Sequence, residues 1–191
     1  MTSETAAAAV AARPASAELP HRRDVDGPFE FAPHRCFACG ELNEHGLHLD
    51  LHVDPDGAWT ELTLEPQFQG WEAVAHGGIL CTLLDEVMAW SVIGRGTWGV
   101  TVRLNATFRK PLPTGRRIRA EGRVVEMNRR ASRTEGKVFD PASGDVFATA
   151  EGSFMALPER DIDRLKARYG MRRLADPQAA TADTAGAGAG S

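Results

Sequence analysis

The stretch that decides the fold is HGGILCTLLDEVMAWSVIG, residues 76–94. Apolar side chains occupy nearly every helical position from Gly77 onward. Its few polar residues are Thr82, Asp85, Glu86 and Ser91. A helix that is apolar on almost every side must be covered all round by other parts of the chain. The pattern therefore predicts a buried helix that ends at Gly94 or Gly96.

The segments on both sides of this helix alternate apolar and polar residues, which is typical of strands. Upstream, LHLDLHVDP and AWTELTLEP flank Asp56-Gly57 and predict a hairpin. Downstream, four more strands are expected in residues 99–110, 116–128, 130–140 and 145–157, followed by a short polar helix in 159–173. An antiparallel sheet of about six strands, curled around the helix, is the economical cover for it. We therefore expect an α+β chain with the hotdog architecture.

Composition limits the domain organisation and the classes of partner. Both ends of the chain are rich in Ala, Gly, Ser, Thr and Pro, so we expect disordered tails at residues 1–27 and 171–191 around one folded domain at 28–170. The net charge of -4 provides no global basic field, and no nucleic acid is expected as a partner. We also expect no signal peptide, no stretch long enough to span a membrane, and a cytoplasmic location.

Two stretches resemble a known family: FQGWEAVAHGGILCTLLDEVMAW, residues 68–90, and TVRLNATFRKPLPTG, residues 101–115. They are similar to the hotdog thioesterases of the phenylacetate-pathway and human THEM-type families. The upstream CFACGELNEHGLHLDL, residues 36–51, looks like the entry segment of many bacterial members. The resemblance implies hydrolysis of an acyl-CoA by a homodimer, which can pair into a dimer of dimers. It implies no cofactor other than the coenzyme A of the substrate.

The helix start is suited to hold a polarised carbonyl group. Gly77 and Gly78 carry no β-carbon, so a substrate can approach backbone N–H groups where the helix dipole favours negative charge. The resemblance implies that Gly77 donates the N–H of an oxyanion hole, with Gly78 beside the substrate. His76 either orients this loop or a water molecule, or is a structural histidine.

Asp85 is the strongest catalytic candidate. An aspartate in the middle of an apolar helix should face a polar cavity, where it can act as nucleophile or as general base for water. The resemblance implies that Asp85 reaches across the dimer interface to the thioester at Gly77 of the partner subunit. The alternative is a structural ion pair or an interface hydrogen bond. Glu86 is the rival acid on the same stripe, and we assign it a substrate contact.

Three further assignments concern the substrate. The resemblance aligns Thr101 with a threonine that assists the attacking water, although Thr101 can equally be an ordinary strand residue. Coenzyme A requires local cations, for which we favour Arg129 and Arg130 at a hairpin over Arg109 and Lys110 at a strand end. An apolar acyl pocket can be drawn from Trp71, Trp90, Trp98, Met88 and Phe108, each of which can instead be a core residue.

Cys36 and Cys39, together with His34 and His45, suggest a zinc site at first sight. There is no second Cys-X-X-Cys pair, and the spacing of the histidines fits no known zinc module. We therefore expect no metal, and interpret the segment as a structural turn that packs Phe37 beside the helix.

Two other functions are compatible with the same fold. One is hydration or dehydration of an enoyl or hydroxyacyl thioester, with His76 as the essential base. The other is a non-catalytic acyl-CoA binding module.

Overall fold

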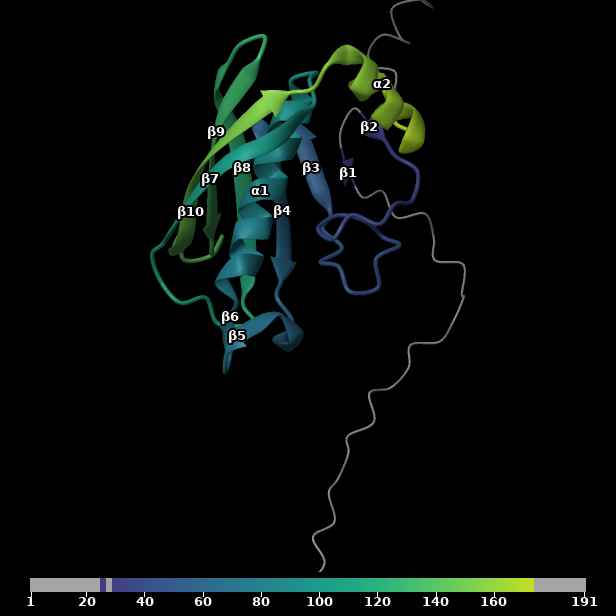
Figure 1. The fold of residues 1–191 in the computed structure, drawn as a ribbon. Coiled ribbons are helices and arrows are strands. Elements are labelled where there is room, and N and C mark those ends of the chain that lie inside the picture. The colour runs from purple at the N-terminus through teal and green to yellow at the C-terminus, as the bar shows by residue number, and fades with distance from the viewer. Residues whose placement is uncertain (1–24, 27–28, 174–191) are drawn as a thin grey trace, which may run out of the picture.

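The computed structural model describes residues 25–26 and 29–173 and has one long helix held inside a curled sheet (Figure 1). The helix is α1, Gly77–Gly94. The sheet has the strand order β1-β3-β4-β8-β9-β10-β7, with the bounds Val25–Asp26, Leu51–Asp54, Gly57–Thr63, Arg117–Met127, Ala131–Phe139, Val146–Ala156 and Gly99–Phe108. All neighbours pair antiparallel except β1 and β3, which are parallel. The hotdog fold expected from the sequence is confirmed.

Helix α1 lies directly on the sheet because small residues allow a close approach. A β-carbon at Gly122 in β8 would lie 2.5 Å from the carbonyl carbon of Val87, so the helix and strand backbones touch there. The buried residues of α1 are Leu80, Leu83, Leu84, Val87, Met88, Trp90, Ser91 and Val92. Burial of a large apolar side chain contributes about 1.5–3 kcal/mol. The apolar helix and the inner face of the sheet together form the core.

The length of α1 corrects one expectation. Its 18 residues have a mean hydropathy of 1.4, which is long and apolar enough to cross a membrane by length and composition alone. The expectation that no stretch reaches this length is therefore wrong. The core helix of a folded domain meets the same criterion, and here the sheet curls around α1 (Figure 1).

The segment directly before α1 contains elements that the sequence did not predict. A 3-10 turn, η1 (Pro66–Phe68), leads into a small hairpin of β5 (Gln69–Trp71) and β6 (Val74–Ala75). Strands of two or three residues are too short to show alternation, which is why they were missed. The hairpin matters because it delivers His76, whose backbone N–H donates to the Phe68 carbonyl at 2.9 Å.

Both ends of the fold extend slightly beyond the predicted limits of 28 and 170. Strand β1 lies before residue 28, and β11 (Arg172–Arg173) pairs with β2 (Phe29–Glu30). The predicted C-terminal helix is confirmed as α2, Glu159–Arg168. The rest of the predicted tails lies outside the described residues.

Candidate active site

The first turn of α1 has one backbone N–H that donates to no acceptor among the described residues. His76 caps the helix: its Nδ1 accepts from the Gly78 N–H at 2.8 Å, and its carbonyl accepts from Ile79 at 2.9 Å and Leu80 at 3.4 Å. Among the described residues, the Gly77 N–H has no acceptor. A free N–H at a helix N-terminus can bind a carbonyl oxygen as that oxygen gains negative charge. This is the donor that the resemblance assigned to Gly77.

The cap also shows what His76 does in the fold. Because Nδ1 accepts the Gly78 N–H, the imidazole ring holds the loop that presents Gly77. The ring therefore holds this loop, which fits both the orienting role and the structural role that the sequence left open. The side chain of Gln69 also forms a hydrogen bond within the fold: its Oε1 accepts from the Ala73 N–H at 3.1 Å in the β5–β6 turn.

Asp85 and Thr101 meet through a hydrogen bond. The Thr101 hydroxyl donates to Asp85 Oδ1 at 2.8 Å. Within the part of the chain that the structure describes, Asp85 forms no ion pair. The two catalytic candidates are thus neighbours, although Asp85 lies on the helix and Thr101 on strand β7.

A bulge in β7 explains how Thr101 reaches Asp85. Arg103 pairs with Ser153 and Thr101 pairs with Phe154, so Val102 is an extra residue between the two pairs. Paired residues on antiparallel strands point to the same face, and Phe154 is buried in the core. Thr101 therefore faces α1. Simple alternation from Arg103 would have pointed Thr101 to the opposite face of the sheet.

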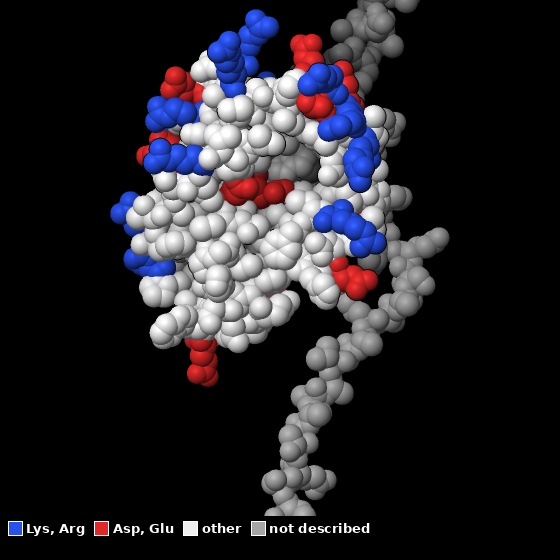
Figure 2. All heavy atoms as spheres, viewed as in Figure 1, with Lys and Arg blue, Asp and Glu red and all other residues white. Residues whose placement is uncertain are grey.

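Asp85 and Gly77 cannot act on one carbonyl within a single protomer. They are eight residues apart on α1, which is about 12 Å along the helix axis at about 1.5 Å per residue. Phe108, at the other end of β7 from Thr101, lies beside Gly77, since a β-carbon there would be 3.3 Å from its ring. Figure 2 shows that this side of the molecule is largely uncharged, with acidic side chains in a hollow and Lys and Arg at its margins.

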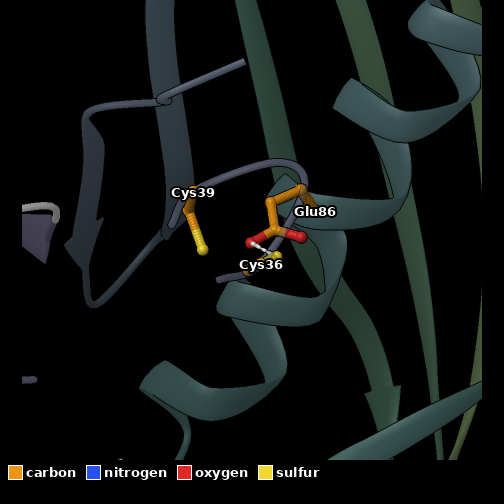
Figure 3. A group of neighbouring side chains, drawn as sticks. All are labelled: Cys36, Cys39 and Glu86. Atoms are coloured by element: carbon orange, nitrogen blue, oxygen red, sulfur yellow. Dashed lines mark hydrogen bonds between the residues drawn. The ribbon is translucent and has the colours of Figure 1, made fainter. Parts of the chain in front are cut away.

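Glu86 is turned away from this pair. Its Oε1 accepts from Trp90 Nε1 at 2.9 Å and lies 4.0 Å from Cys36 Sγ (Figure 3). Burial, and next the charge of Cys36, raise the pKa of Glu86 to about 7. The predicted substrate contact for Glu86 therefore finds no support in its position, because this carboxylate faces the segment before β3.

That segment is a turn whose cysteines, and not Phe37, contact the helix. Phe37 is 43% exposed, whereas Cys39 is buried and Cys36 partly buried. The expectation that Phe37 packs beside the helix is thus wrong. A hydrogen bond from the Cys39 thiol lowers the pKa of Cys36 to about 5, and the same bond followed by burial raises the pKa of Cys39.

The cations proposed for coenzyme A lie far from Gly77 of the same protomer. Arg129 and Arg130 follow the end of β8, an 11-residue strand that starts beside the segment before α1. The hairpin is thus about 33 Å from that end. Within the described residues neither arginine forms an ion pair. Lys110, from the second candidate patch, is paired with Asp145.

A separate groove of about 890 Å³ lies on the outer face of the sheet, away from α1. The row that crosses it, Trp59, Glu121, Lys137, Thr149 and Thr107, is paired strand to strand. Its charges largely neutralise one another, since Glu121 pairs with both Arg119 and Lys137. It is an open, polar surface and contains none of the catalytic candidates.

Four of the five residues considered for an acyl pocket form two groups, and the fifth, Trp98, is partly buried. Met88 and Trp90 are buried core residues. Trp71 is 84% exposed, and Phe108 is 53% exposed beside Gly77. Of the five candidates, Phe108 is the one adjacent to the free N–H.

Comparisons with known proteins agree with this architecture. Residues 72–146 match the family model described as the thioesterase superfamily. Mouse acyl-coenzyme A thioesterase 13 is 28% identical over 104 residues, which are 53% of this chain and 69% of that protein.

Solved structures with the same fold include a hypothetical thioesterase from Streptococcus pneumoniae with coenzyme A, at 19% identity and a TM-score of 0.53 over 55% of this chain and 81% of that chain. The E. coli PaaI protein from the phenylacetic acid degradation operon has 19% identity and a TM-score of 0.50, over 53% and 72% of the two chains. These two structures are evidence of the fold, and the resemblance drawn from the sequence is confirmed.

Proposed function

We propose that this chain, whose residues 72–146 match the family model of the thioesterase superfamily, hydrolyses acyl-CoA thioesters. Two features of α1 together carry the proposal: the free N–H of Gly77 at the helix start, and the Asp85 carboxylate, which accepts a hydrogen bond from Thr101. The similarity to mouse acyl-coenzyme A thioesterase 13 supports the same substrate class.

In the proposed reaction, the Gly77 N–H binds the thioester carbonyl oxygen and stabilises the charge that develops on it. If Asp85 acts as nucleophile, it attacks the carbonyl carbon, the carbon–sulfur bond breaks, and coenzyme A leaves as the thiol with a proton from solvent; water then hydrolyses the acyl–Asp85 anhydride to the free acid and restores the carboxylate. If Asp85 acts as general base, it removes a proton from the water molecule that attacks the carbonyl carbon, the carbon–sulfur bond breaks, and coenzyme A leaves as the thiol with that proton, so that the free acid remains. Thr101 holds Asp85 through the hydroxyl hydrogen bond.

The active unit in this proposal is a homodimer. Strand β7 is the edge of the main sheet, and Val100 and Val102 on it are 49% and 56% exposed. An exposed apolar edge strand offers unpaired backbone groups to a second strand. Two antiparallel β7 strands with Thr101 opposite the partner's Phe108 would bring Asp85 of one protomer to Gly77 of the other. This arrangement removes the 12 Å separation, at about 1.5 Å per residue, that one protomer has.

The same symmetry gives the basic hairpin a role. Arg129 and Arg130 are distant from Gly77 in their own protomer, but an antiparallel partner reverses the direction of the sheet. The partner's hairpin would then approach the end where Gly77 lies. We propose that these guanidinium groups bind coenzyme A phosphates in this way. The alternative hydratase function is less well supported, because His76 Nδ1 is already occupied by the Gly78 N–H.

The first test measures release of thiol from a panel of short, long and aromatic acyl-CoAs. Asp85→Asn keeps the size of the side chain and is expected to abolish turnover. Gly77→Pro removes the backbone N–H at the first helical position, where proline is tolerated. It is also expected to be inactive. Full activity of either variant would reject the assignment.

Mixing the two inactive variants tests whether the site is shared. A heterodimer contains one intact site, formed by Gly77 of the Asp85→Asn chain and Asp85 of the Gly77→Pro chain. After subunit exchange at equal amounts, about a quarter of the wild-type activity should return, because half of the dimers are mixed and each has one working site. If the mixture stays inactive although exchange is demonstrated, the two residues do not act across subunits.

A further inference from the structure

Two cysteines and one glutamate that the proposed thioesterase reaction does not use converge on one point (Figure 3). The ligand atoms of Cys36, Cys39 and Glu86 all lie within 4.8 Å of one another. The cysteines come from the turn before β3 and the glutamate from α1, with 50 residues between Cys36 and Glu86. The sequence suggested histidines as additional ligands, but neither His34 nor His45 is part of this group. The third ligand is a carboxylate from the core helix.

The turn that carries the two cysteines is tightly closed. A hydrogen bond runs from the Gly40 N–H to the Cys36 carbonyl at 3.0 Å. A β-carbon at position 40 would lie 2.4 Å from the Cys36 nitrogen, so the turn requires glycine there. This closed backbone fixes Cys36 and Cys39 relative to each other.

The turn is also braced from outside. His34 Nδ1 accepts from the Cys36 N–H at 3.3 Å, so this nitrogen is hydrogen-bonded to the backbone of the turn. The Ala38 and Phe37 carbonyls accept from Leu49 at 2.9 Å and Leu47 at 2.8 Å. The two sulfur atoms are therefore held in place before any ligand arrives, which lowers the cost of organising a site.

The third ligand of the cluster has no basic partner among the described residues. No lysine or arginine there forms an ion pair with Glu86. A divalent cation bound by the three groups, whose ligand atoms lie within 4.8 Å of one another, would offset most of the charge of two thiolates and a carboxylate.

We propose that Cys36, Cys39 and Glu86 bind a thiophilic divalent cation, Zn²⁺, that links the turn before β3 to helix α1. Zinc binds sulfur at about 2.3 Å and carboxylate oxygen at about 2.0–2.2 Å, so tetrahedral ligands lie about 3.3–3.8 Å apart. The widest separation in the cluster needs to shorten by about 1 Å. Three protein ligands leave one coordination position for water.

A carboxylate as the third group favours this site over a redox-active cysteine pair. Formation of a disulfide between Cys36 and Cys39 needs no third residue. A zinc ion uses all three groups, since thiolate and carboxylate are both among its usual ligands.

The experiment uses the full chain without a histidine tag. Metal content is measured by atomic absorption, and the metal-free protein is titrated with Co²⁺ under anaerobic conditions while the thiolate-to-cobalt charge-transfer band is recorded. We expect about one Co²⁺ per chain and a band that Zn²⁺ abolishes by displacement. Cys36→Ser and Cys39→Ser should lose most of the band. Glu86→Gln should keep thiolate absorption but bind at least about tenfold more weakly.

Cys81→Ser is the matched control, because Cys81 is the third cysteine, lies on α1 and is outside the cluster. It should bind Co²⁺ like the wild type. The proposal is overturned if the wild-type protein shows no thiolate band, or if Glu86→Gln binds as tightly as the wild type. It is equally overturned if Cys36 and Cys39 form a disulfide in air and the reduced protein binds no metal. The wild-type spectrum decides the question even if the serine variants fail to fold.

Discussion

Replacement of Thr101 by valine tests the alignment of the proposed catalytic carboxylate with almost no change in shape. The variant removes the hydroxyl that donates to Asp85 Oδ1 at 2.8 Å. A hydrogen bond to a charged group contributes about 1.5–3 kcal/mol, which corresponds to about a 10- to 150-fold change in rate. We therefore expect kcat for acyl-CoA hydrolysis to fall at least about tenfold.

The loss should appear in kcat, with KM nearly unchanged, because Thr101 contacts Asp85, which acts in the chemical step of the proposed reaction. Thr101→Ser retains the hydroxyl and should stay close to the wild type. Thr107→Val makes the same chemical change on the same strand, but Thr107 lines the groove on the outer face, so no loss is expected. Thermal unfolding of all three variants checks that the fold is intact. The reasoning fails if Thr101→Val keeps full activity, or if Thr107→Val loses as much.

Two further predictions concern stability, measured by urea unfolding. Gly122→Ala places a β-carbon 2.5 Å from the Val87 backbone, where no side-chain rotation relieves the overlap, and should cost at least about 2 kcal/mol. Gly136→Ala meets the Glu121 carbonyl oxygen and two side chains, each at the longer distance of 3.2 Å, and should cost clearly less. Equal losses would contradict the close helix contact. The pKa of Glu86 is raised from 4.5 to about 7, so the metal-free folded chain holds a proton that the unfolded chain releases, and the contribution of Glu86 to stability should fall by up to about 3 kcal/mol between about pH 4.5 and pH 8, while the lowered pKa of Cys36 acts in the opposite direction above about pH 5. Glu86→Gln should remove that part of the fall, and an unchanged pH dependence in this variant would contradict the assignment.

Most of the fold follows from periodicity. Alternation over seven or more residues identified β4, β7, β8, β9 and β10, and the run of apolar residues after Gly77 identified α1. The β5–β6 hairpin could not be found in this way, because strands of two and three residues carry no period. The pairing of β1 beside β3 is likewise set by tertiary contacts and not by a two-residue pattern.

The residues of the candidate site could be predicted where they belong to one segment of the sequence. They could not be predicted where they depend on packing between distant segments. An aspartate within an apolar helix and glycines at its start are visible in the sequence. The direction of Thr101 is not, because an extra residue at Val102 reverses the face on which alternation would place it. The meeting of Glu86 with Cys36 and Cys39 depends on a contact between segments 50 residues apart, which no local spacing encodes.

Three consecutive residues of helix α1 contact three different parts of the fold. Successive side chains on a helix point about 100° apart. Asp85 faces β7, Glu86 faces the cysteine turn, and Val87 rests on β8 at Gly122. A rotation of the helix by about 20° would move a carboxylate about 6 Å from the axis by about 2 Å, which is enough to break the bond to Thr101.

The contacts of Val87 with β8 and of Glu86 with the cysteine turn therefore control the direction of Asp85. The backbone contact at Gly122 fixes the height of the helix on the sheet, but a contact at one point leaves rotation about the helix axis open. A second anchor at Glu86, about 100° around the helix, restricts that rotation. The position of the cysteine turn next to Asp85, the proposed catalytic residue, thus has a physical reason. An ion bound there would hold Asp85 toward Thr101 without touching the substrate.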